Sequence, residues 1–376
     1  MSRLRIGVVG VRGIGRHHLE QLSRISRAEI AGVADLDADA SRQAGEQWQA
    51  IPLPTLEAML TAGGVDAVIL ATPHHLHAPM SLSALSAGVH VYVEKPIANR
   101  VSDADRMVEL AAAENLVLAV GHQYRTFPAN QALHDIVTSG QLGRIHRVIW
   151  QWLEARSEAY YNRDPWRCRW EQAGGGVLVN QASHDIDLLC WLCGEPAEVS
   201  AIVGNRGHRH EVEDTAIATV RFASGVVASL QYSTWEGCLN YRQISGDLGV
   251  AVLQHEQDAN VTGLPDQLRL GTYPTPLPEI ITDAERRVER PQPQWRDIDC
   301  GDFTIGPTLM ESFVDACLDG TEPITTGASA RTTIELINAI LLSGLRKKVV
   351  EFPVDRQDFD ELMGELIRGD LTTPTL

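Results

Sequence analysis

The sequence has little of what marks a membrane, secreted or nucleic-acid-binding protein. No apolar run reaches about 18 residues, so the sequence predicts no membrane-spanning helix. The N-terminal stretch passes from a short apolar run straight into a glycine-rich loop and has no signal-peptide pattern, so we expect a cytoplasmic protein. Basic residues are scarce, with 32 Lys and Arg against 49 Asp and Glu and a net charge of −17. Such a surface repels phosphate backbones and anionic lipid, which argues against a nucleic-acid or membrane partner.

Cysteine is too sparse and too scattered to predict a metal site. The six cysteines include one CxxC pair, Cys190 and Cys193, in an apolar stretch with no second pair to complete four ligands. The histidines at 74, 75 and 77 have no carboxylate or cysteine at ligand spacing either. We therefore expect buried, reduced thiols and no metal.

The length of 376 residues is too great for one compact core and predicts two domains, which we divide between residues 122 and 123. Residues 1–122 alternate apolar strand patterns with amphipathic helical ones. This alternation is typical of an α/β domain whose parallel sheet is covered on both faces, as in the Rossmann fold. The predicted strands are Leu4–Val9, Glu29–Ala34, Asp66–Ala71, Val89–Val93 and Leu116–Val120.

Residues 123–376 change pattern and predict an α+β domain with an open-faced, mainly antiparallel sheet, because apolar and polar residues alternate as in strands with one buried face. The Pro-rich segment Gly263–Gln294 has little periodicity and is expected to be a long surface excursion. The predicted strands are Arg144–Leu153, Ala216–Phe222, Val226–Tyr232 and Val250–Gln254. The predicted helices are His184–Cys193, Thr308–Leu318, Ala328–Leu345 and Asp355–Ile367.

A dinucleotide-binding fingerprint follows the first predicted strand. Residues 10–15 read GVRGIG, so the turn at Gly10, Gly13, Ile14 and Gly15 would offer backbone N–H groups and a helix N-terminus to a pyrophosphate. Asp35 closes the second strand, where a carboxylate can accept hydrogen bonds from both ribose hydroxyls. The same carboxylate would repel a 2′-phosphate, so we expect NAD, with NADP less favoured.

Arg12 stands where the fingerprint usually has its second glycine. Its side chain can crowd the pyrophosphate or clamp a phosphate oxygen. It can also meet a 2′-phosphate, which would weaken the preference for NAD. In the helix that follows, His17 and His18 are expected on the surface.

Four further motifs, taken together, resemble the glucose–fructose oxidoreductase, inositol dehydrogenase and rhizopine catabolism (Gfo/Idh/MocA) oxidoreductase family. They lie at residues 71–77 (ATPHHLH), 88–96 (GVHVYVEKP), 121–125 (GHQYR) and 174–188 (GGGVLVNQASHDIDL), so the resemblance covers nearly the whole chain. It implies a Rossmann domain followed by an open-faced sheet domain, in a homodimer or homotetramer. It also implies hydride transfer between a nicotinamide and a secondary alcohol or ketone of a sugar, cyclitol or sugar derivative.

The resemblance implies roles for particular residues. Lys95 matches the family's active-site lysine, and His184 matches its catalytic histidine. Asn180 lies four residues before His184, at a position where many members carry an aspartate. The chain departs from the family here, and we still count Asn180 among the candidate catalytic residues. The cofactor contacts expected besides the glycine turn and Asp35 are Thr72, Pro73, His74, His77, Glu94, Lys95 and Gln123.

These residue types suit the oxidation of a secondary alcohol, in which the hydroxyl proton must leave and the developing alkoxide needs a donor or a positive charge. Lys95 can donate to the substrate oxygen. His184 begins a predicted helix, whose N-terminus favours the neutral imidazole that a general base requires. Asn180 can orient that ring by hydrogen bonding. Lys95 itself, or a tyrosine, is the rival proton carrier.

The stretch Tyr160–Trp170 is rich in aromatic residues and arginines, which stack on sugar rings and hold hydroxyls or carboxylates. Ordinary packing or a subunit contact is the alternative explanation. The candidate substrate-binding residues are Tyr160, Trp166, Arg167 and Arg125, together with Lys95, Asn180 and His184.

Two other functions fit the same motifs. One is a redox-neutral glycoside cleavage that passes through a transient ketone and returns the hydride. The other is a non-catalytic regulator that senses a sugar or NAD, because a fold does not fix a function. The intact Lys95 and His184 argue against the regulator.

Overall fold

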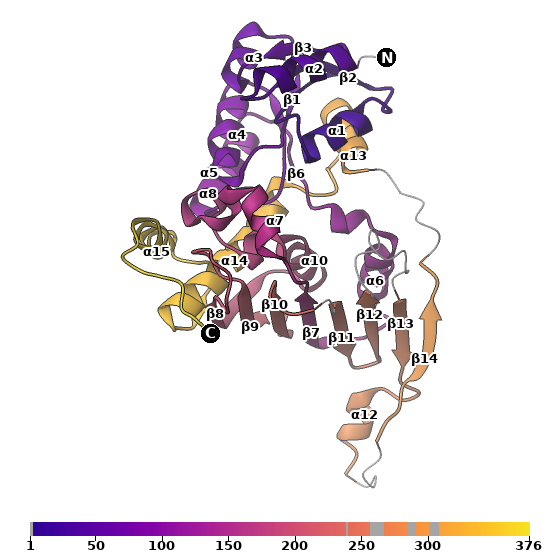
Figure 1. Ribbon diagram of the computed structural model, residues 1–376. Helices are drawn as coiled ribbons and strands as arrows, with labels where there is room; N and C mark the ends of the chain where they lie inside the picture. Colours follow the sequence, from indigo (N-terminus) through magenta and orange to yellow (C-terminus); the bar gives the residue numbers. More distant parts are fainter. Residues whose placement is uncertain (1–2, 238–239, 256–266, 285–289, 301–307) are drawn as a thin grey trace. The chain divides into compact units, whose positions relative to one another are not determined.

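The computed structural model describes residues 3–237, 240–255, 267–284, 290–300 and 308–376. The chain folds into two compact units, whose helices and strands are labelled in Figure 1. Two further segments, 171–174 and 306–335, group with the first unit, although the predicted division assigns them to the domain that starts at residue 123. The first unit comprises residues 1–123, 171–174 and 306–335, and the second comprises residues 124–170, 175–305 and 336–376.

A parallel sheet forms the centre of the first unit (Figure 1). Its strand order is β3-β2-β1-β4-β5-β6, and each described pairing is parallel. The order reverses between β1 and β4, which creates the crevice where doubly wound sheets bind dinucleotides. The strands are β1 (Leu4–Val9), β2 (Ala28–Ala34), β3 (Ile51–Leu53), β4 (Ala67–Leu70), β5 (His90–Val93) and β6 (Leu118–Val120).

The core around β1 explains why a distant helix belongs to this unit. Phe313 and Val314 of α13 (Leu309–Asp319) are buried in one cluster with Ile6 of β1 and Leu19 of α1 (Ile14–Leu22). Burying such a side chain contributes about 1.5–3 kcal/mol, so α13 is held by the Rossmann sheet rather than by its neighbours in sequence. The remaining helices of this unit are α2 (Ala38–Trp48), α3 (Leu56–Ala62), η1 (His74–Leu76), α4 (His77–Ser86) and α5 (Val101–Ala113).

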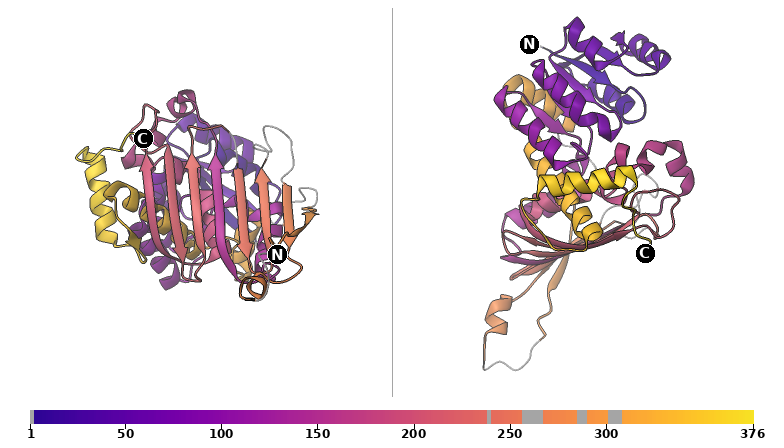
Figure 2. Two further views of the ribbon diagram at one scale, coloured as in Figure 1. Left: turned by 90° about the horizontal axis from the view of Figure 1, so that it is seen from below. Right: turned by 90° about the vertical axis from the view of Figure 1, so that its left-hand side faces the viewer.

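Within the described residues, nine strands form the sheet of the second unit, in the order β14-β13-β12-β11-β7-β10-β9-β8-β15. The described neighbours are antiparallel except β7 and β10. Buried and exposed residues alternate along β9 and β10, so one face is packed and the other is open (Figure 2, left). The strands are β7 (Ile145–Leu153), β8 (Pro196–Gly204), β9 (Thr215–Phe222), β10 (Val227–Ser233), β11 (Asn240–Gly246), β12 (Gly249–His255), β13 (Gln267–Thr272), β14 (Gln294–Ile298) and β15 (Val350–Glu351).

Helices pack on the inner face of this sheet, where α6 lies against β12 and β13 and α9 lies against β9 and β10. The helix α14 contributes residues to both units. The helices of the second unit are α6 (Pro128–Thr138), α7 (Glu158–Arg163), η3 (Pro165–Cys168), α9 (Val177–Asn180), α10 (Ser183–Cys193), α12 (Leu277–Ile281) and α15 (Arg356–Arg368). Three more helices have residues in both units: η2 (Gln123–Thr126), α8 (Trp170–Ala173) and α14 (Gly327–Arg346).

The prediction of a surface excursion over Gly263–Gln294 is wrong for part of that segment. Residues 267–272 form β13, which pairs with β12, and Gln294 begins β14. Leu268 and Leu270 are 1% and 2% exposed, so this strand does alternate, although the surrounding prolines obscure the pattern. Residues 263–266 and 285–289 of the segment lie outside the described residues.

The predicted fold class, a Rossmann domain followed by an α+β domain with a mainly antiparallel sheet, is confirmed. Among the helices that the structure describes, none has the length and apolar character needed to cross a bilayer. Cys190 and Cys193 are buried free thiols, and burial raises the pKa of Cys193 to about 12. Both thiols are therefore poor nucleophiles and poor metal ligands at neutral pH.

Candidate active site

The turn between β1 and α1 has the geometry of a dinucleotide-binding loop. Gly10 and Gly13 have φ values of 85° and 49°, which favour glycine. A Cβ on Gly10 would lie 2.4 Å from the carbonyl oxygen of Ala71, and one on Gly15 would lie 1.7 Å from that of Gly10. A Cβ on Gly13 would meet nothing within 4 Å, and no side chain caps the N-terminus of α1. The turn therefore fits the approach of a pyrophosphate to backbone N–H groups.

Asp35 is fixed against this turn. Its two carboxylate oxygens accept hydrogen bonds from the backbone N–H of Val11, at 3.1 Å, and of Asp37, at 2.9 Å. These bonds hold the carboxylate at the end of β2, where the fingerprint requires a ribose acceptor. The position of Asp35 therefore fits its predicted role toward NAD.

Arg12 forms an ion pair with Asp37, and both side chains are largely exposed. Because Asp37 offsets its charge, the guanidinium is less suited to attract a phosphate than an isolated arginine would be. Its predicted contact with the cofactor stays a prediction. Asp37 was not among the candidate residues, although its place two residues after Asp35 puts it within reach of the same turn.

A buried contact between a histidine and a carboxylate involves Glu94, the residue before Lys95. Glu94 follows β5, and its carboxylate contacts Nε2 of His18 at 2.7 Å and accepts a hydrogen bond from the backbone N–H of Lys95 at 3.3 Å. Burial raises the pKa of Glu94, but the hydrogen bond from His18 and the neighbouring His18, Lys95 and His77 together outweigh burial and leave that pKa below its ordinary value. The expectation that His18 lies on the surface is wrong, because this side chain is 4% exposed and packs on Tyr92.

His77 joins two loops of the candidate cofactor site. Its Nδ1 lies 2.7 Å from the carbonyl oxygen of Pro96 and its Nε2 lies 2.8 Å from that of Thr72. Burial lowers the pKa of His77, so the neutral ring donates to one of these oxygens at a time. These contacts indicate that His77 positions the segment carrying Lys95, and its predicted contact with the cofactor stays a prediction.

The other predicted contacts of the first unit are distributed over its loops. Nδ1 of the buried His74 lies 3.0 Å from the carbonyl oxygen of Ala173. Thr72 donates to the sulfur of Met80 at 3.7 Å, and the exposed Gln123 begins η2. Pro73 precedes η1.

In the second unit, His184 lies in the first turn of α10. Its ring stacks on that of Tyr124, with centroids 4.8 Å apart and an interplanar angle of 20°. The guanidinium of Arg242 lies 5.8 Å from the Tyr124 ring and is bound by the buried Asp185 at 2.9 Å. The stacked ring and the fixed helix turn thus restrict the orientation of His184.

Asn180 contacts the arginine-rich segment that precedes it in the sequence, and its predicted contact with His184 stays a prediction. Its Oδ1 accepts a hydrogen bond from Arg167 at 3.2 Å, and its Nδ2 donates to the carbonyl oxygen of Gly175 at 2.9 Å. The guanidinium of Arg167 lies 4.4 Å from the Trp166 ring, and Tyr160 accepts a hydrogen bond from Gln181 at 2.8 Å. The structure therefore brings together the predicted Tyr160, Trp166, Arg167 and Asn180 and adds Gln181.

Arg125 is 5% exposed and makes two hydrogen bonds to the buried carboxylate of Asp187, at 2.8 and 2.7 Å. This fork-to-fork pair gives the guanidinium a structural partner in the core of the second unit. The contacts lend no support to a substrate-binding role for Arg125, which stays a prediction.

Glu213 was missed by the sequence reasoning. Its buried carboxylate accepts hydrogen bonds from the backbone N–H of Gly176, at 2.7 Å, and of Leu178, at 3.1 Å. It thereby fixes the glycine-rich run that leads to Asn180. Burial raises the pKa of Glu213 to about 7. No local pattern in an acidic stretch such as 211–214 distinguishes this carboxylate from a surface one.

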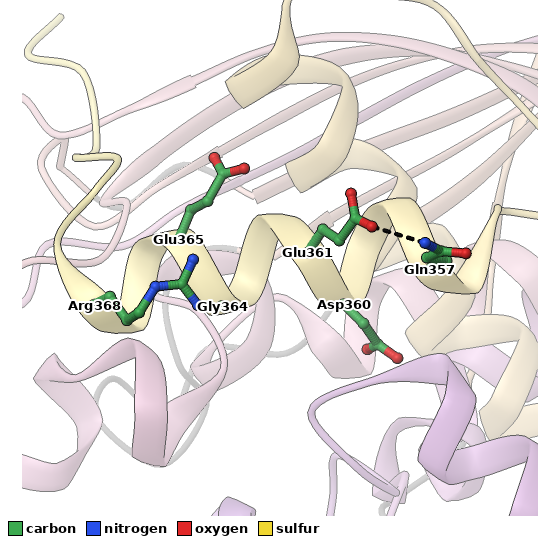
Figure 3. A pocket seen from close by; sticks show the side chains of 6 residues that line it. All are labelled: Gln357, Asp360, Glu361, Gly364, Glu365 and Arg368. Carbon is green, nitrogen blue, oxygen red and sulfur yellow. Dashed lines mark hydrogen bonds between the residues drawn. The ribbon is translucent and has the colours of Figure 1, made fainter.

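A hollow along α15 is a separate surface feature (Figure 3). It is lined by one helix alone and includes Asp360, Glu361 and Arg368, with Glu361 accepting a hydrogen bond from Gln357 at 2.8 Å. It contains none of the predicted site residues, so we do not assign it to catalysis. Among the described residues, no group of three His, Cys, Asp or Glu side chains is arranged to hold a metal ion.

Comparison with known proteins identifies the class. Residues 4–122 match the model of the oxidoreductase family with an NAD-binding Rossmann fold, and residues 130–252 match that of the GFO/IDH/MocA C-terminal domain. The chain therefore belongs to the GFO/IDH/MocA oxidoreductase family. The predicted resemblance, the NAD-binding Rossmann domain and the class of oxidoreductase are confirmed.

Individual relatives show the range of this family. The chain is 32% identical to 1,5-anhydro-D-fructose reductase of Ensifer adhaerens over 232 residues, which cover 60% of this chain and 67% of the relative. It is 28% identical to 2,7-anhydro-N-acetylneuraminate hydratase of Escherichia coli over 265 residues, or 68% of this chain and 69% of the relative. It also superposes on the WlbA dehydrogenase of Bordetella pertussis, in complex with NADH and UDP-GlcNAcA, with a TM-score of 0.77 and 27% identity over 94% of this chain and 100% of that one.

Proposed function

We propose that this chain transfers a hydride between NAD and a secondary alcohol or ketone of a sugar, a cyclitol or a sugar derivative. The observation that carries the proposal is the glycine turn with the fixed Asp35, in a chain that belongs to a family of oxidoreductases. We also propose the corresponding division of labour, with cofactor binding in residues 1–122 and substrate binding and oligomerisation in residues 123–376.

Two side chains carry the proton chemistry in this proposal. Lys95 donates to the substrate oxygen and stabilises negative charge as it develops there. His184 accepts the hydroxyl proton during oxidation and returns it during reduction. NAD, when bound, supplies the hydride acceptor. Two contacts support these roles: the stack with Tyr124 restricts the His184 ring, and the hydrogen bond from the backbone N–H of Lys95 to Glu94 fixes the backbone that carries the lysine.

The test is the absorbance of reduced nicotinamide during incubation of the protein with NAD and a panel of inositols, aldoses, glycosides and nucleotide sugars. Lys95→Met and His184→Asn should each lower kcat by about 100-fold or more, while the Kd for NADH of His184→Asn changes little. Near-normal turnover of either variant would remove that residue from the proposed mechanism. A protein that binds no dinucleotide would overturn the proposal as a whole.

A redox-neutral reaction is the second candidate, because one relative is named a hydratase rather than a dehydrogenase. Here bound NAD would oxidise the sugar transiently, and the same hydride would return after an elimination step. Tightly bound NAD that copurifies with the protein, together with product formation without net NADH, would favour this candidate. Steady accumulation of NADH would exclude it.

We further propose a cytoplasmic homodimer or homotetramer. The open face of the second unit's sheet supports self-association, because Ile202 and Ile217 are 61% and 47% exposed there. Sedimentation of the purified protein tests the oligomeric state, and cell fractionation tests the location. A monomer, or a protein recovered outside the cytoplasm, would contradict the respective proposal.

A further inference from the structure

Three arginines surround one tyrosine in the second unit. The guanidinium carbons of Arg156, Arg163 and Arg167 lie 5.5, 5.9 and 6.0 Å from the centroid of the Tyr160 ring. The chain as a whole has a net charge of −17, so its mean field repels anions. A local concentration of positive charge is therefore what an anionic ligand would need to bind.

The acidic residues nearby compensate this cluster only in part. Glu154 pairs with Arg156 at 2.8 Å, while Asp164 lies 3.4 Å from Arg163 and 3.8 Å from Arg167. Within the described part of the chain, these two carboxylates are the ones within ion-pair distance of the three guanidinium groups. Two negative charges thus face three positive ones. The contact of Arg167 with Asp164 is the longest of these ion pairs and exceeds hydrogen-bond length.

Arg167 is held in place by neutral groups. Its Nη1 donates to Oδ1 of Asn180 at 3.2 Å, and its guanidinium stacks 4.4 Å from the Trp166 ring. Asn180 is 3% exposed, and its own Nδ2 donates to Gly175, which fixes its oxygen toward Arg167. An aspartate in this place would cancel the charge of Arg167, whereas the asparagine orients the guanidinium and leaves its charge in effect.

Tyr160 supplies a second donor beside Arg167. Its hydroxyl oxygen accepts a hydrogen bond from Gln181 at 2.8 Å, and a hydroxyl that accepts can also donate its own O–H to a ligand. Asn180 ends α9, and Gln181 lies two residues before the start of α10, the helix that carries His184. The pair of donors is thus built onto the segment that leads to the proposed base.

We propose that Arg167, assisted by Tyr160, binds an oxyanion on the sugar, so that the substrate is a sugar bearing a carboxylate or a phosphate. This inference rests on the hydride transfer proposed above and specifies its substrate class. A guanidinium that is oriented in advance and incompletely neutralised favours such a group over a neutral hydroxymethyl group.

The test compares pairs of sugars of the same configuration. One pair is a hexuronate and its hexose, and the other is a hexose phosphate and its hexose, each offered as the free sugar. The wild-type protein should prefer the anionic member by about 10- to 100-fold in kcat/KM, the range expected for a charge-assisted hydrogen bond. The preferred pair identifies the anion as carboxylate or phosphate.

Matched variants locate the effect. Arg167→Gln should abolish the preference, and Arg167→Lys should retain part of it. Arg169→Gln removes one positive charge from the same segment at an exposed arginine that pairs with Glu211, and it should leave the preference within about 3-fold of wild type. Equal or better use of the neutral sugars by the wild type, or an unchanged preference in Arg167→Gln, would overturn the proposal.

Binding separates this inference from the proposed reaction. Trp166 contacts Arg167, so titration of tryptophan fluorescence with the anionic and the neutral sugar, with NADH present, measures affinity without turnover. Tighter binding of the anionic sugar that is lost in Arg167→Gln would support the oxyanion site even if no NADH forms. Equal affinities in wild type and variant would refute the site, whatever the reaction proves to be.

Discussion

Replacing Glu213 by glutamine should flatten the pH dependence of stability in the second unit. Burial raises the pKa of Glu213 from the ordinary 4.5 to about 7, while two backbone N–H groups hold its carboxylate. A carboxyl with a raised folded-state pKa stabilises the fold fully below the unfolded pKa, near 4.5, and this contribution is lost as the pH rises through about 7. At about 1.4 kcal/mol per pKa unit, the loss between these limits is about 3 kcal/mol.

Glutamine is neutral at every pH and has nearly the same shape. Its amide oxygen can accept one of the two N–H bonds, so the variant loses about 1 kcal/mol at pH 4.5. Between pH 4.5 and 8 the wild-type free energy of unfolding should fall by about 3 kcal/mol more than that of Glu213→Gln. His208 contributes in the same direction, because its pKa is raised in the folded protein. Burial lowers that pKa, but hydrogen bonding, chiefly to Asp214, raises it by more. Comparing the two proteins removes this common part.

Urea unfolding followed by tryptophan fluorescence is the assay. Trp48 is the one tryptophan of the first unit among the 8 in the chain, so the signal reports chiefly on the second unit. Glu198→Gln, which removes a half-exposed carboxylate paired with Arg221, is the control for loss of one negative charge. Identical slopes of stability against pH in wild type and Glu213→Gln would refute the reasoning.

Two further predictions concern charged pairs. Asp37→Asn removes the partner of Arg12, and titration of protein fluorescence should show NADPH binding strengthened by about 10-fold relative to NADH; an unchanged ratio would contradict a role for Asp37 in cofactor choice. Asp187→Asn leaves the guanidinium of Arg125 buried without its carboxylate and should cost about 3–5 kcal/mol in urea unfolding, whereas a cost below about 1 kcal/mol would show that the pair is not essential to the core.

Sequence patterns predicted the Rossmann half well because its signals are local. The glycines at 10, 13 and 15 and the carboxylate at 35 are each required by one turn or one strand end. The strand β13 was obscured by flanking prolines, and the helix α13 joined the first unit through apolar contacts made far along the chain. Such contacts depend on tertiary packing, which periodicity alone does not encode.

Several contacts among the candidate site residues could not be predicted from the sequence. The residues Tyr160, Trp166, Arg167 and Asn180 lie together, and Arg167 is one hydrogen-bond partner of Asn180, a pairing that no spacing rule gives. Arg125 was a substrate candidate because arginines hold hydroxyls or carboxylates, and its buried partner Asp187, 62 residues away in sequence, was not predicted. Partners this distant are set by the fold, so the sequence offered no signal for them.

The most direct test of the central claim follows the hydride itself. The protein is incubated with NADH that carries deuterium on the transferring carbon and with keto derivatives of the sugar panel, and the sugars are then analysed by mass spectrometry. The account predicts that one deuterium appears on the carbon that bore the ketone, in wild type and not in Lys95→Met. Sugars that are bound but never labelled, with the deuterium retained on the nicotinamide, would contradict hydride transfer by this protein.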